Sequence, residues 1–158
     1  METNKTQIIS QLKQYFGIKE LVSKAVYTKF GENSWVFLDE KLLANLLVIR
    51  RDILKVPLVI NDWSFGGKNQ QRGLRENISQ IVVQKTKNGI LYLSAHPFGK
   101  AVDFVSAKMS ANEMRREIVN KAYLLPYPMR LESGSSAPTW VHADTMTDDY
   151  SKKIQVFN

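Results

Sequence analysis

The stretch Ser94-Ala-His96-Pro-Phe-Gly99-Lys-Ala-Val-Asp103 places a histidine and a carboxylate on either side of a glycine. The other histidine of the chain lies in Trp140-Val-His142-Ala-Asp144. Histidine is the commonest metal ligand, because one ring nitrogen binds the metal while the other donates the hydrogen bond that fixes the ring. Two histidines and one carboxylate leave the fourth position of a tetrahedral zinc ion for water, as in catalytic zinc sites. The two motifs therefore predict that His96, Asp103 and His142 bind a metal, and the alternative is that the two histidines are unrelated surface or core residues.

The residues around these motifs favour β-strands. Apolar and β-branched residues at 90–93 and 101–105 predict a strand on each side of the first motif, with Gly99 allowing a tight turn between the ligands. A further strand is expected at 140–143. Alternate residues of a strand share a face, so Trp140, His142 and Asp144 would point to the same side. The metal ligands would then meet from strands that are distant in the sequence.

The first 55 residues are expected to be a helical lead-in, because apolar residues recur there at helical spacing. A loop is expected at 31–34, and a long helix capped by Asp39 should end before Pro57. A short strand at 58–60 and a loop at 61–68 follow. Residues 70–87 fit no single pattern, and Asn88-Gly89 predicts a turn.

The C-terminal third combines a helix with a strand. Ser110 and Glu113 form a capping box that opens a helix to about Tyr123, and a loop at 133–136 leads to the last motif. We therefore expect one α+β domain over residues 1–158, with helices packed on a small, mainly antiparallel sheet that carries a zinc-binding cleft.

Composition excludes several classes of protein. The chain of 158 residues has no cysteine, which rules out disulfides, thiolate zinc sites and a cysteine nucleophile. No apolar run reaches the roughly 20 residues of a membrane span, and the N-terminus lacks the pattern of a signal peptide. The net charge of +7 suits either a merely soluble basic surface or an anionic partner. Because the basic residues are scattered, we expect no nucleic-acid binding.

The first motif matches in full the Ser-x-His-x-x-Gly-x-Ala-x-Asp signature of the M15 zinc peptidases, and the second resembles the closing motif of the smaller members. This family comprises D-alanyl-D-alanine carboxypeptidases and dipeptidases, and phage L-alanyl-D-glutamate endolysins. The resemblance implies a hedgehog/D-Ala-D-Ala peptidase-like fold. It also implies that His96, Asp103 and His142 bind Zn²⁺ and that the substrate is a peptidoglycan stem peptide.

Hydrolysis by a zinc-activated water needs a general base, and this chain departs from the family there. Many members have a glutamate three residues before the last histidine, where this chain has Thr139. Asp144 is the first candidate for the base, although it would equally serve to orient a histidine. Glu132 is the second candidate, with an exposed loop carboxylate as the alternative.

The resemblance also implies an arginine that binds the carboxylate of the stem peptide. Arg72 is the first candidate and Arg75 the second, and either residue would otherwise be a solvated surface group. Ser94 either binds substrate or caps its loop. Trp140 and Trp63 either form a wall of a peptide groove or belong to the core.

The expected function is therefore a zinc metallopeptidase of the peptidoglycan, in cell-wall remodelling or phage lysis. The alternative is a non-enzymatic wall-binding or virion structural module that retains the zinc site. Without a signal peptide, the protein would be made in the cytoplasm and released to the wall, or carried in a virion. The scissile bond and the oligomeric state are left open by the sequence.

Overall fold

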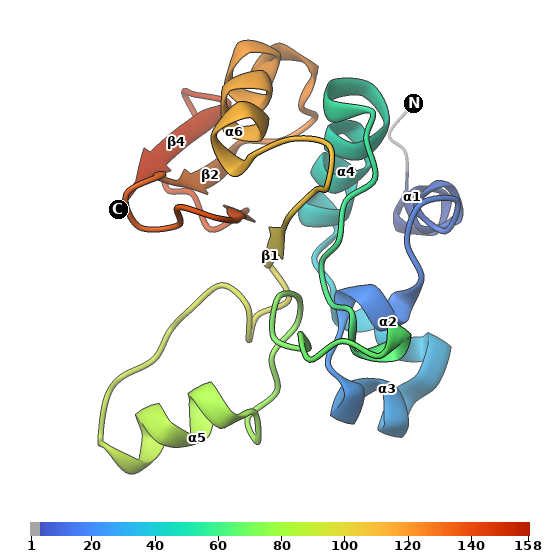
Figure 1. Ribbon diagram of the computed structural model, residues 1–158, viewed down its shortest axis with the longest axis vertical. Coiled ribbons are helices and arrows are strands. Elements are labelled where there is room, and N and C mark those ends of the chain that lie inside the picture. Colours follow the sequence, from blue (N-terminus) through green and yellow to red (C-terminus); the bar gives the residue numbers. More distant parts are fainter. Residues whose placement is uncertain (1–3) are drawn as a thin grey trace.

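The computed structural model describes residues 4–158, so the first three positions of the expected helical lead-in lie outside it. Helices occupy the N-terminal part, as expected from the apolar spacing (Figure 1). They are α1 (Lys5–Leu12), α2 (Ile18–Leu21), α3 (Lys24–Phe30), the 3₁₀-helix η1 (Gly31–Phe37), α4 (Glu40–Val48) and the π-helical η2 (Ile49–Leu54). The loop expected at 31–34 is wrong, because these residues form the first turn of η1.

The best-defined helix begins and ends where the sequence indicates. The Asp39 carboxylate accepts a hydrogen bond from the Leu42 amide at 3.0 Å and caps α4. After η2, Lys55 adopts a left-handed conformation with φ of 58°, which ends the helix before Pro57. The leucines of α4 are buried and α1 packs against this helix, so the N-terminal helices share one core with the sheet.

Four short strands form a mixed sheet in the order β1-β3-β2-β4. These strands are β1 (Ala101–Phe104), β2 (Met129–Glu132), β3 (Val141–Asp144) and β4 (Ile154–Phe157). β3 runs antiparallel to both of its neighbours, whereas β2 and β4 run parallel. The α+β class is confirmed, and the expected strands at 101–105 and 140–143 correspond to β1 and β3. β2 and β4 were not recognised in the sequence.

Two expected strands are absent from the structure of residues 4–158. Val59 forms only an isolated bridge with Val105, and residues 90–93 are irregular. A strand forms only where a partner strand completes its hydrogen bonds. The segment at 58–60 has a single bridge, and residues 90–93 have no partner strand within residues 4–158. The first histidine motif therefore connects an irregular segment to β1, rather than joining two strands.

Four further helices of the described chain lie in the second half of the fold or in the loop before it. They are η3 (Trp63–Phe65), α5 (Gln80–Lys87), α6 (Ala111–Asn120) and η4 (Ala122–Leu124). α6 has the expected capping box of Ser110 and Glu113 and packs against β3 and η2, whereas α5 lies on the other side of β1 (Figure 1). No helix within residues 4–158 is both long and apolar enough to cross a membrane.

Candidate metal centre

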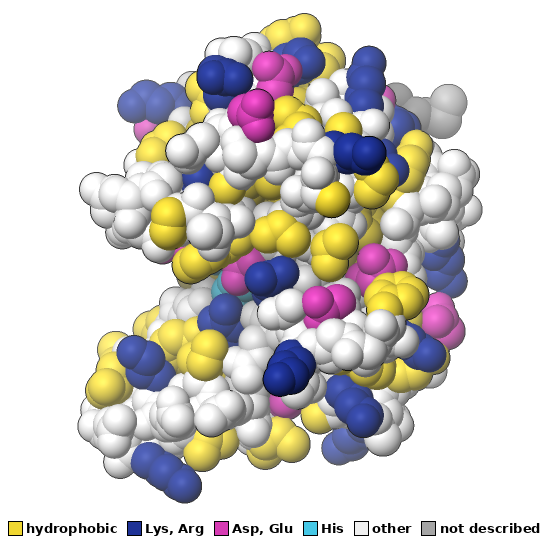
Figure 2. All heavy atoms as spheres, viewed as in Figure 1, with side chains coloured by type: hydrophobic (Ala, Val, Ile, Leu, Met, Phe, Trp, Pro, Cys, Tyr) yellow, Lys and Arg dark blue, Asp and Glu magenta, His cyan; other side chains and the backbone are white. Residues whose placement is uncertain are grey.

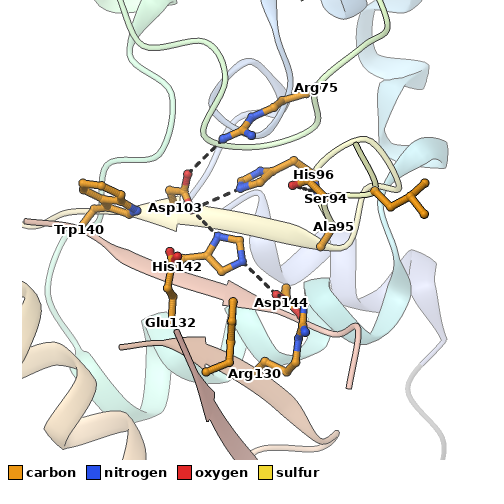
Figure 3. Close-up of a pocket in the computed structure, with 12 residues that line it drawn as sticks. Arg75, Ser94, Ala95, His96, Asp103, Arg130, Glu132, Trp140, His142 and Asp144 are labelled. Atoms are coloured by element: carbon orange, nitrogen blue, oxygen red, sulfur yellow. Dashed lines mark hydrogen bonds and ion pairs between the residues drawn. The ribbon is translucent and has the colours of Figure 1, made fainter. Parts of the chain in front are cut away.

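Three residues that are far apart in the sequence meet beside β1 and β3. The register of these strands places Asp103 directly opposite His142, and His96 approaches from the loop before β1 (Figure 3). Oδ1 of Asp103 lies 2.7 Å from Nδ1 of His142 and 3.3 Å from Nε2 of His96. One ligand atom from each residue lies within 4.8 Å of the other two. This group could hold a metal ion, as the sequence predicts.

The hydrogen bonds of the two rings leave one nitrogen of each histidine for a metal. Nδ1 of His96 lies 2.8 Å from the Gly73 carbonyl oxygen, which can only accept, so this nitrogen carries the proton. Nε2 of His142 lies 2.9 Å from Oδ2 of Asp144 and is held in the same way. His96 Nε2 and His142 Nδ1 therefore remain as ligand atoms. Fixing the second ring nitrogen in this way is typical of histidines that bind metals.

The position of the His96 loop is set by close packing of its backbone against neighbouring segments. Gly99 has φ of 67°, and a Cβ atom at this position would lie only 2.0 Å from the Phe37 carbonyl oxygen. Its amide donates to the His96 carbonyl at 3.1 Å, which closes the turn. The turn that the sequence predicts at Gly99 is thus confirmed. Gly73 likewise approaches Leu21, where a Cβ atom would lie 2.0 Å from the carbonyl oxygen.

Asp144 is fully buried and its carboxylate is completely occupied. Arg130 on β2 donates from Nε to Oδ1 at 2.8 Å, and from its terminal nitrogen to Oδ2 at 2.9 Å. The Met146 amide donates to Oδ1 at 2.9 Å, in addition to the contact with His142. The Arg130 guanidinium also lies over the Phe157 ring, 4.4 Å from its centroid. Asp144 therefore links His142 to a fixed cation.

Sequence reasoning missed Arg130, although it named Asp144. Arg130 faces Asp144 across the pair formed by β2 and β3. The alternation of apolar and charged residues in Met129-Arg-Leu-Glu132 is a sequence signal that could have revealed this strand. The sequence gives no indication of the register that joins the two residues.

Burial and charge shift the protonation of the site in opposite directions. Burial lowers the pKa of His142, but hydrogen bonds and charges from Asp103 and Asp144 outweigh it and raise the pKa to about 9. Burial raises the pKa of Asp103, yet contacts with His142 and His96 hold this pKa well below its usual range. The pKa of Asp144 is lowered by His142 and Arg130 against the effect of its burial. Without a metal, His142 is thus a cation held between two carboxylates.

The triad opens into a cleft of about 280 Å³. Figure 2 shows a deep hollow in the surface, with histidine atoms and charged groups of both signs at its back. Its lining residues come from the loop before β1, from the sheet, from the segment before α5 (Arg75) and from the residue before β3 (Trp140): Arg75, Leu93, Ser94, Ala95, His96, Asp103, Arg130, Glu132, Trp140, His142, Asp144 and Phe157. Ser94, Trp140, Glu132 and Asp144 are thus brought together with the ligands. The shared face expected for Trp140, His142 and Asp144 is present.

The two candidate arginines differ in position. The Arg75 guanidinium reaches the cleft, donates to Tyr92 Oη and to the Gln71 carbonyl at 2.6 Å each, and lies 3.6 Å from Oδ2 of Asp103. Arg72 is not among the lining residues; its carbonyl accepts from the Asp103 amide at 2.7 Å. Arg72 therefore supports the site through its backbone carbonyl, whereas Arg75 places its guanidinium in the cleft.

Glu132 occupies the last position of β2 and does not lie on a flexible loop. Its half-buried side chain lies beside His142 (Figure 3) and makes no hydrogen bond or ion pair with any residue in 4–158. The buried Arg115 of α6, another residue missed in the sequence, donates to the Glu132, Ala137 and Trp140 carbonyls. Arg115 thereby fixes the end of β2 relative to the start of β3.

Trp63 has no place in this cleft. Its indole nitrogen donates to the Val22 carbonyl at 3.0 Å, and its ring lies against Tyr27. Of the two tryptophans considered for a groove, only Trp140 lines the cleft.

No protein-family model, curated protein or solved structure matches this chain. The likeness to M15 peptidases therefore rests on the two sequence motifs.

Proposed function

We propose that this protein is a zinc-dependent peptidase that hydrolyses peptide bonds in peptidoglycan stem peptides or cross-links. One observation carries the proposal: His96 Nε2, Asp103 Oδ1 and His142 Nδ1 converge, while the other nitrogen of each histidine is held by an acceptor. A set of two imidazoles and one carboxylate suits zinc better than magnesium or calcium, which prefer oxygen ligands. The M15-like motifs favour the same metal and the same class of substrate.

When bound, zinc would lower the pKa of a water molecule and polarise the scissile carbonyl. His96, Asp103 and His142 would hold the ion. Asp144, tied to Arg130, keeps the His142 ring in the orientation that presents Nδ1. The protein's own contribution is therefore a fixed set of ligands in a partly enclosed cleft.

Glu132 is the general base in this proposal. Its carboxylate borders the cleft and has no partner within the described residues, so it is available to take a proton from water and pass it to the leaving amine. Asp144 is less suited, because Arg130, His142 and the Met146 amide already occupy its oxygens. We assign Asp144 to positioning the His142 ring. Glu132 takes the role of the glutamate that many M15 members have at the position of Thr139.

Arg75 would bind the substrate carboxylate. Its backbone-anchored Nε holds the guanidinium in place, and a planar guanidinium matches the geometry of a carboxylate. Ser94 and Trp140 border the same space and would contact the peptide. The net charge of +7 suits an anionic wall, which the protein would reach by release from a cell or as part of a virion.

The test is mass spectrometry of purified muropeptides incubated with the protein, with zinc and with a chelator. We expect a new product that disappears with chelator and returns when zinc is restored. The His96→Ala variant should lose both bound zinc and product. Unchanged muropeptides with a stoichiometrically zinc-loaded, folded protein would overturn the peptidase proposal.

Thr139 is the one observation that favours a second function. A wall-binding or virion structural module could keep the metal site for stability and dispense with the usual glutamate. Such a module predicts binding of muropeptides without turnover in the zinc-loaded protein. Turnover that depends on Glu132 would exclude it.

A further inference from the structure

The chain between Leu91 and Ala95, here called the edge segment, enters the cleft with its backbone unpaired. Among residues 4–158, no hydrogen-bond partner exists for the amides of residues 91–95 or for the carbonyls of residues 91–94. The first backbone bond after this stretch is the one from the Lys100 amide to the Ala95 carbonyl, at 3.0 Å. An unpaired backbone that borders a cleft resembles the free edge of a sheet.

The side chains of the edge segment alternate as in an extended strand. Leu91 and Leu93 are 84% and 65% exposed, whereas Tyr92 and Ser94 between them are half-buried. A period of two is typical of extended backbone. This alternation explains why the sequence predicted a strand here: the conformation suits a strand, but the partner is lacking within the described chain.

The edge segment is held at both ends and in its middle. The Ile90 amide donates to the Lys85 carbonyl at 2.9 Å, which ties its start to α5. Tyr92 Oη accepts from Arg75, and Ala95 leads directly to the ligand His96. A segment fixed in this way offers its amides and carbonyls without a large ordering cost.

We propose that residues 91–95 bind the substrate peptide in an extended conformation, as a strand added along the edge segment that leads to the metal ligands. This inference rests on the proposed peptidase function. Leu93, Ser94 and Ala95 line the same cleft as the triad, so a peptide paired with them continues past His96. In an added strand, main-chain hydrogen bonds supply affinity, and the amides and carbonyls of alternate residues of the edge point toward the partner. The exposed Leu91 and Leu93 flank the bound peptide.

Amide hydrogen exchange with purified muropeptides tests the inference. The full-length protein is kept metal-free with chelator, so that binding is observed without cleavage, and a shift of the Trp140 indole resonance reports occupancy of the cleft. With nine in ten molecules occupied, we expect about tenfold slower exchange at alternate amides of the edge segment, because exchange then proceeds from the free fraction. The exposed Lys68 amide, which also lacks a partner within residues 4–158, is the control and should exchange at an unchanged rate.

The outcomes separate the two proposals. A shifted Trp140 resonance with unchanged exchange at all five amides would overturn the added strand. An edge segment that binds the peptide through its backbone should do so without the metal. If the zinc-loaded protein cleaves the muropeptides but the metal-free protein does not bind them, the added strand is therefore also overturned. Failure of the peptidase proposal gives a different result, namely no cleavage by the zinc-loaded protein.

Discussion

The guanidinium of Arg130 donates to both carboxylate oxygens of Asp144, at 2.8 Å and 2.9 Å, and Asp144 in turn contacts Nε2 of His142. Paired hydrogen bonds between arginine and a carboxylate are strong and directional. Because Asp144 is fully buried, this pair also satisfies a charge that would be costly alone. Asp144 is thus committed to Arg130 and His142, whereas the Glu132 side chain has no hydrogen bond or ion pair with any residue in 4–158.

Substituting the two carboxylates separately should give different defects. We expect Glu132→Gln to retain stoichiometric zinc and lose about 10²–10⁴-fold in turnover, because it removes a base. Asp144→Asn should weaken zinc binding by about 10–100-fold, because it disturbs the contact that orients His142. Zinc titration and muropeptide turnover measure the two effects. The reverse pattern would assign the base to Asp144.

Zinc binding should release a proton at neutral pH. His142 of the metal-free protein has a pKa of about 9 and is protonated at pH 7, whereas a ligand nitrogen must be free of its proton. We expect release of about one proton, and an apparent zinc affinity that falls roughly tenfold per pH unit below pH 9. Calorimetry in buffers of different ionisation enthalpy measures the proton count. Zinc binding with no proton release at pH 7 would show that His142 is not protonated in the metal-free state.

The metal-free protein should lose stability as the pH rises. The pKa of His142 is raised from 6.5 to about 9, so the protonated ring stabilises the fold fully below pH 6.5 and this contribution is lost through pH 9. The loss should be at most about 3 kcal/mol in the free energy of unfolding. Denaturant unfolding in chelator at pH 6 and pH 9.5 measures it. The His142→Ala variant is the control and should show a smaller dependence over this range.

Replacing Arg115 should destabilise the sheet beside the cleft. Arg115→Ala leaves the carbonyls of Glu132, Ala137 and Trp140 without their donor, and we expect a loss of about 2–4 kcal/mol. Arg116→Ala is the matched control, because Arg116 is the exposed neighbour on α6 and should change stability by less than about 0.5 kcal/mol. Equal effects of the two substitutions in denaturant unfolding would contradict this role of Arg115.

The substitution Gly99→Ala should lower the free energy of unfolding more than alanine at a glycine with a similar backbone angle. Gly99 and Gly89 have φ of 67° and 65°, but only at Gly99 does a Cβ atom meet a neighbour, the Phe37 carbonyl. Gly89→Ala should cost about 1 kcal/mol from backbone strain alone. Gly99→Ala should cost at least about 2 kcal/mol more and weaken zinc binding, because the His96 turn must shift. Similar unfolding midpoints for the two variants would contradict the close packing.

Local sequence determined the parts of this protein that depend on neighbouring residues. Asp39 capped the long helix, the Ser110 box opened α6, and Gly99 allowed the turn before β1. These features form through hydrogen bonds and backbone angles within a few residues. The group of His96, Asp103 and His142, which could hold a metal ion, was also apparent in the sequence, because few residue types bind metals and their spacing is distinctive.

Only the tertiary structure decided which groups meet across the sheet. β2 and β4 were not predicted from the sequence, and the register that places Arg130 opposite Asp144 depends on which strands pair, so only the folded chain brings these two residues together. Residues 90–93 have the composition of a strand but no partner, because pairing depends on what the rest of the chain brings alongside. Strand register and burial are long-range properties. They decide that Asp144 is fully hydrogen-bonded while the Glu132 side chain has no partner within residues 4–158, and that Arg75 but not Arg72 lines the cleft.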